Sequence, residues 1–107
     1  MAELPPDLQE GARLFNAGHW WEAHEAWEGP WLTATGERRA LLSALILLAA
    51  ALHRRWRMGS TAHRNYFKAQ KYVLALPEVA EGVPIRALSA EVWAALQAEE
   101  LRPQIGG

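Results

Sequence analysis

Two side chains that can bind a metal ion or move a proton, His24 and Glu28, lie four residues apart in the first third of the chain. Four residues is about one helical turn, so both side chains lie on the same side of a helix. Nitrogen and oxygen ligands at this spacing can hold a divalent ion such as zinc when another element supplies further ligands. His53 is the first candidate for that ligand because it ends an apolar run, and His63 is the second.

Three interpretations of the pair remain open from the residues alone. In the first, His24, Glu28 and His53 form a buried polar clasp in which each satisfies the hydrogen bonds of another. In the second, the same three residues bind a metal, and Glu25 or Glu22 lies near a bound water whose proton it takes. The third is acid–base chemistry without a metal. Because such pairs are more often structural, we expect the clasp, although Glu22 and Glu25 stay secondary candidates for a site.

The helix that carries the pair is also rich in tryptophan. One stripe of this helix, at about 100° per residue, consists of Trp20, Ala23, Trp27 and Trp31. His24 borders this stripe, and Glu28 lies next to His24. Aromatic stripes at helical spacing are typical of core packing, so we expect the stripe to be buried. Trp21 lies off the stripe and is predicted to be a contact residue.

Helical periodicity and end signals recur along the chain and predict five helices. Their predicted ranges are about 8–17, 20–29, 37–58, 61–76 and 86–101. Asp7 is the predicted N-cap of the first helix and Ser60 of the fourth. The first two helices are joined by a very short turn at Gly18 and should form an antiparallel hairpin. No segment alternates with period two for long enough to predict a strand.

The length and composition set the class of protein. A chain of 107 residues is long enough for one domain, so we predict a single all-α domain over 1–107, a compact irregular bundle of about five helices beginning with a helical hairpin. The absence of cysteine excludes disulfides and thiolate metal sites. The chain shows no secretion signal, and its longest apolar run, 41–52, is shorter than the about 20 residues that span a bilayer. We therefore expect a cytoplasmic protein without membrane contact.

Charge is unevenly distributed although the net charge is −1. Six acids and one base precede Trp31, whereas residues 53–71 hold six bases and no acid. With Tyr66 and Tyr72 nearby, the basic segment suggests nucleic-acid binding. The carboxylates of the second helix can neutralise this segment within the fold, however, so we do not expect nucleic acid as a partner. A homo-oligomer and a small-molecule ligand both remain open.

Two blocks of the sequence also resemble a known family. The first block runs from Phe15 to Trp31, and its residues His24, Glu28 and Trp31 fit a His-x-x-x-Glu-x-x-Trp pattern. The second is the apolar run that ends at His53. Together they resemble a bacterial and archaeal family known as a domain of unknown function, DUF309. The second block is followed by Gly59-Ser60, where the family often has Gly-Asn.

The resemblance implies a small multihelical fold in a prokaryotic protein. It also implies that the His and Glu of the pattern bind metal, but it carries no activity that transfers to this chain. The sequence therefore predicts a non-enzymatic binding or self-associating module with a His/Glu cluster at the edge of its core. The alternative is a metal-binding protein or metal-dependent hydrolase that uses His24, Glu28 and His53.

Overall fold

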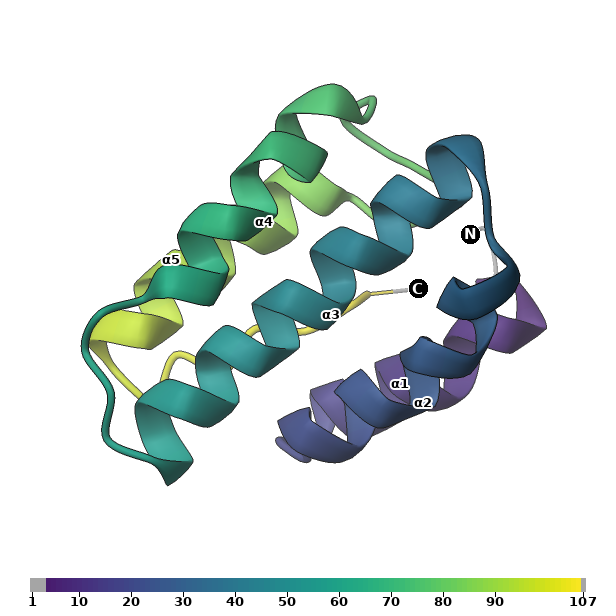
Figure 1. The fold of residues 1–107 in the computed structure, drawn as a ribbon. Helices are drawn as coiled ribbons and strands as arrows, with labels where there is room; N and C mark the ends of the chain where they lie inside the picture. The colour runs from purple at the N-terminus through teal and green to yellow at the C-terminus, as the bar shows by residue number, and fades with distance from the viewer. Residues whose placement is uncertain (1–3, 107) are drawn as a thin grey trace.

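The computed structural model describes residues 4–106, which form five helices (Figure 1). They are α1 (Pro6–Asn16), α2 (Trp20–Thr33), α3 (Gly36–Arg57), α4 (Arg64–Ala75) and α5 (Ile85–Gln97). Within the described residues there is no strand, and a single isolated bridge pairs Ala80 with Val83. The predicted all-α bundle of five helices is thus confirmed.

The longest helix, α3, lies in the middle of the bundle. The α1–α2 hairpin lies on one side of it and the α4–α5 pair on the other (Figure 1). α2, α4 and α5 all pack on α3, so its apolar residues are covered from several directions. The fully buried side chains of α3 include Leu41, Leu45, Leu48 and Leu52. Ile46, Leu47 and Ala50 remain only half-buried, on a face of α3 that its neighbours leave open.

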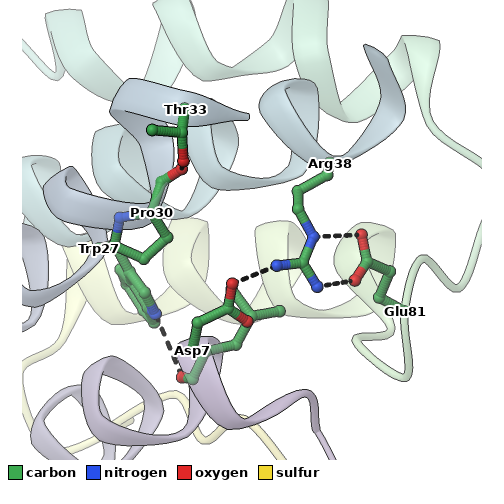
Figure 2. Close-up of polar contacts among 7 residues, drawn as sticks. Asp7, Trp27, Pro30, Thr33, Arg38 and Glu81 are labelled. Carbon is green, nitrogen blue, oxygen red and sulfur yellow. Dashed lines mark hydrogen bonds and ion pairs between the residues drawn. The ribbon is translucent and has the colours of Figure 1, made fainter. Parts of the chain in front are cut away.

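The hairpin of α1 and α2 is held by Trp27, which is fully buried. Its indole Nε1 donates a hydrogen bond of 3.2 Å to the Leu8 carbonyl on α1 (Figure 2). The ring lies against Gly11, which has no side chain to keep the two helices apart. The predicted burial of the tryptophan stripe is confirmed for Trp20 and Trp27, whereas Trp31 is half-buried.

The end of α2 differs from the prediction, because the helix passes through Pro30 and ends at Thr33. Proline lacks the N–H that would bond to the preceding turn. The turn that follows Pro30 contacts α3: the Arg39 guanidinium donates to the Trp31 carbonyl at 3.0 Å and lies 3.9 Å from the centroid of the Trp31 ring. Tertiary contacts to α3 thus hold the last turn of α2, beyond the local stop signal.

The predicted cap of α1 is wrong, since Pro5 occupies the N-cap position and no side chain bonds there. Asp7 instead pairs with Arg38 at the start of α3 (Figure 2). Arg38 also donates two hydrogen bonds, of 3.2 and 2.5 Å, to the Glu81 carboxylate in the connector before α5. Hydrogen bonding with Glu81, together with both carboxylate charges, raises the pKa of Arg38 despite partial desolvation. One guanidinium therefore joins three parts of the chain.

The predicted cap of α4 is also wrong. Ser60 lies four residues before the helix, and His63 holds the N-cap position in a left-handed conformation with φ of 56°. The Ser60 hydroxyl accepts only a weak local bond from the Ala62 N–H, at 3.4 Å. The first turn of α4 consequently has no side-chain cap.

The end of α5 also differs from the prediction, because the helix ends at Gln97 rather than near 101. The tail beyond α5 folds back to α1, where the Asn16 side chain bonds both the N–H and the carbonyl of Ile105.

Substitution of Gly11 by alanine tests the close approach of α1 and α2. A Cβ at Gly11 would lie within 3.0 Å of three ring atoms of Trp27, including Nε1. Gly11→Ala should therefore lower the free energy of unfolding by about 1–3 kcal/mol, the usual cost of overpacking, despite its better helix propensity. Urea denaturation followed by circular dichroism measures this change.

Gly29→Ala is the matched control, because a Cβ there meets no atom within 4 Å. Alanine has the better helix propensity, but the following Pro30 crowds its Cβ, and these two effects oppose each other. The free energy of unfolding of Gly29→Ala should therefore stay within about 0.5 kcal/mol of the wild-type value. The double variant Gly11→Ala/Trp27→Leu should lose less stability than the sum of its single changes. Strict additivity would show that the glycine and the indole are not in contact.

Candidate functional site

Trp21 and His53 face each other across the boundary between α2 and α3. The Trp21 ring stacks on His24 with a centroid separation of 4.6 Å and an interplanar angle of 21°. The same ring lies 5.1 Å from the His53 ring. These three rings line a cavity of about 390 Å³, which we call the aromatic groove. Its remaining lining residues are Ile46, Leu47, Ala50, Arg54, Met58 and Asn65.

His24 and Glu28 are neighbours on α2, as their spacing predicts, but they are not hydrogen-bonded. His24 Nδ1 lies 3.8 Å from Glu28 Oε1, beyond hydrogen-bond distance. The histidine side chain is 16% exposed, whereas the glutamate side chain is 54% exposed. His24 Nδ1 is buried and has no hydrogen-bond partner among the described residues. The two side chains therefore form a loose ion pair at most, rather than a tight buried clasp.

His53 lines the aromatic groove together with His24, and its ring contacts the Trp21 ring. Burial lowers the pKa of His53 below its ordinary value of 6.5. The positive charges of Arg57 and Arg54 lower this pKa further, while Glu22 opposes them. The resulting preference is for a neutral imidazole, which keeps one nitrogen as a donor and the other as an acceptor.

The predicted ligands are not gathered into a metal-binding group. Within residues 4–106, no three His, Asp or Glu side chains are placed so that they could hold a metal ion. Glu22 and Glu25 are exposed on α2, as expected for the far side of the stripe. His63 lies away from the aromatic groove, with its ring 5.6 Å from that of Trp93 on α5.

Trp31, the third motif residue, has a structural contact of its own. Its Nε1 donates a 2.9 Å hydrogen bond to the Ser43 hydroxyl on α3, and Ser43 donates at 2.7 Å to the Arg39 carbonyl. A second hollow of about 240 Å³ lies beside Trp31 and Glu28, and it adjoins the aromatic groove at Ile46 and Leu47. The motif residues thus line two separate hollows, His24 the aromatic groove and Glu28 and Trp31 the second one.

The sequence predicts Trp21 only as a contact residue, and it does not place Trp21, Arg54 or Asn65 beside His24 and His53. The signal for Trp21 was present, since it lies off the buried stripe and precedes His24 by one turn. Only the fold, however, shows that His53 meets the same ring. Arg54 follows His53 directly in sequence, but Asn65 belongs to α4 and reaches the groove through tertiary packing.

The fold and the motif define a class of protein: a small helical bundle that begins with a hairpin and carries the His-x-x-x-Glu-x-x-Trp pattern on its second helix. The family model described as "Domain of unknown function (DUF309)" matches residues 8–72. The chain therefore belongs to the DUF309 family.

A solved structure is similar to this chain in both sequence and fold. The crystal structure of a conserved hypothetical protein, TTHA0068, from Thermus thermophilus is 43% identical to this chain, with a TM-score of 0.79. The match covers 90% of this chain and all of that one. No curated protein sequence matches the chain. Among the described residues, no helix is both long and apolar enough to cross a bilayer.

The different contacts of Glu28 and Trp31 predict different effects on stability. Glu28→Ala removes an exposed carboxylate whose partner is 3.8 Å away, so the free energy of unfolding should change by less than about 0.5 kcal/mol. Trp31→Phe leaves the Ser43 hydroxyl without its donor and should cost about 1 kcal/mol or more. Urea denaturation compares them. A large loss in Glu28→Ala would support the tight clasp instead.

The lowered pKa of His53 predicts a pH dependence. As the pH falls below 6.5, the unfolded chain takes up a proton at His53 before the folded chain does. The free energy of unfolding should therefore decrease as the pH is lowered through the interval between 6.5 and the lower folded pKa. Urea titrations across this interval should show a shallower dependence of the free energy of unfolding on pH in His53→Gln than in the wild type, and an unchanged dependence would contradict this prediction.

Proposed function

We propose that the protein is a non-enzymatic binding module and that its ligand occupies the aromatic groove. The observation that carries this proposal is the position of Trp21, whose ring contacts both His24 and His53 while 44% of the residue stays exposed. An exposed indole held against two imidazoles offers a flat surface for a ring or a short apolar group. The ligand we propose is a small molecule with a flat apolar body.

The lining of the groove suits binding. Half-buried aliphatic side chains of α3, Ile46 and Leu47, give it an apolar floor, and a few polar groups surround that floor. Small-molecule sites usually combine such a floor with sparse polar groups that orient the ligand. His24 and His53 both line the groove, so each imidazole can present a ring nitrogen to a ligand.

The same lining favours binding over catalysis. The described residues that line the aromatic groove include no carboxylate, hydroxyl or thiol side chain. A hydrolytic mechanism needs a nucleophile or an activated water, usually with a carboxylate that orients the histidine. Glu28, the nearest carboxylate to His24, lies 3.8 Å away and half-exposed.

Titration with 1-naphthol tests this proposal, because the probe supplies a flat apolar body without charge. In ¹H–¹⁵N NMR spectra, saturable shifts should appear at the Trp21 indole and at α3 residues 46–54. Trp21→Ala should weaken binding by about tenfold or more, since stacking on an indole is lost.

Trp93→Ala is the matched control, because Trp93 is similarly exposed, at 40%, but lies on α5 outside the groove. This variant should bind 1-naphthol as the wild type does. Equal losses in both variants, or shifts spread over the whole surface, would overturn the proposal. Metal that copurifies in stoichiometric amount and is lost in His24→Ala would favour the metal-dependent alternative.

A further inference from the structure

A second cavity, of about 460 Å³, opens between the end of α3, the connector 58–63 and the first turn of α4. We call it the basic cavity, because Arg54, Arg64 and Lys68 all line it. It shares Arg54 and Asn65 with the aromatic groove. The two cavities are therefore adjacent and can be occupied by different parts of one ligand.

The cations of the basic cavity have no acidic partner within the described residues. None of Arg54, Arg64 and Lys68 forms an ion pair with a carboxylate of residues 4–106. The sequence suggests the carboxylates of α2 as their partners, but among the described ion pairs the only one with an α2 carboxylate is that of Glu28 with His24. In the segment 53–71, only Arg57 forms such a pair, with Glu99 at 3.3 Å. Uncompensated like charges around a cleft concentrate positive potential inside it.

Backbone donors add to this positive potential. α4 begins at Arg64 and has no side-chain cap, so the first N–H groups of the helix have no acceptor from a capping side chain. Its first residues, Arg64 and Asn65, line the basic cavity. Three side-chain cations and free backbone donors around one space favour an anion with several oxygens over a single carboxylate.

We propose that the basic cavity binds the phosphate group of a ligand whose flat body lies in the aromatic groove. The ligand class is thus a phosphate monoester of a small aromatic or heteroaromatic compound. This inference rests on the proposed function, which places the flat aromatic part of the ligand in the aromatic groove. Arg54, which lines both cavities, stands at the junction between body and phosphate. Arg64 and Lys68 contact only the phosphate end.

Three probes separate the parts of this proposal: 1-naphthol for the body, 1-naphthyl phosphate for the complete ligand, and inorganic phosphate for the anion alone. Calorimetric titration at low and moderate salt measures their affinities. We expect 1-naphthyl phosphate to bind at least about tenfold more tightly than 1-naphthol, as two charge-assisted hydrogen bonds would give, and this advantage should shrink with added salt.

Arg64→Gln and Lys68→Gln should each remove most of this advantage and leave the affinity for 1-naphthol unchanged. Both residues are exposed, so the variants should fold, and their circular dichroism spectra check this. Lys71→Gln is the matched control: Lys71 is an exposed cation on the same helix, near the Tyr72 ring and outside the basic cavity. It should bind all three probes as the wild type does.

The outcomes distinguish this inference from the proposed function. Equal affinities for 1-naphthol and 1-naphthyl phosphate would overturn the phosphate site while leaving the aromatic groove in place. Binding of inorganic phosphate that depends on Lys68, without any binding of 1-naphthol, would support the anion site and overturn the groove. If Lys71→Gln weakens binding as much as Lys68→Gln, the attraction is a general effect of surface charge, and the proposed site is wrong.

Discussion

The contact between Trp27 and α1 is the constraint on which the rest of the structure depends. The indole is fully buried, lies against Gly11 and bonds the Leu8 carbonyl, so α2 can take only one rotation about its own axis. Once that rotation is set, helical geometry turns Trp20 inward and leaves Trp21 and His24 at the boundary with α3. The arrangement of the candidate site is thus a consequence of core packing one to two turns away.

α3 contributes the other half of the site through its unequal faces. Most of its apolar residues are covered by α2, α4 and α5, but one stripe is left between these helices. Along this stripe the lining changes from apolar Ile46 and Leu47 to the charge of Arg54. A single helix therefore supplies apolar and then basic surface, which is a suitable arrangement for a ligand with distinct ends.

The sequence predicted the parts of the fold that local patterns determine. Five helices, the hairpin turn at Gly18 and the burial of Trp27 follow from periodicity and end signals. The errors occur where distant residues are in contact: α2 continues through Pro30 to a last turn that Arg39 of α3 bonds, and Asp7 pairs with Arg38 across the fold instead of capping α1. For the site, spacing placed His24 beside Glu28, but no local pattern shows that Trp21 lies between His24 and His53.

The order in which the helices pack also bears on how the chain folds. Each helix packs on the next one in sequence, and the main contact between helices that are not consecutive is that of α5 with α3. Such local connectivity is typical of chains that fold within microseconds to milliseconds, because little loop entropy must be lost before contacts form. The hydrogen bonds between Asn16 and Ile105 join residues 89 positions apart. We expect these hydrogen bonds to form last, after the helices have packed, when the C-terminal tail binds to the completed bundle.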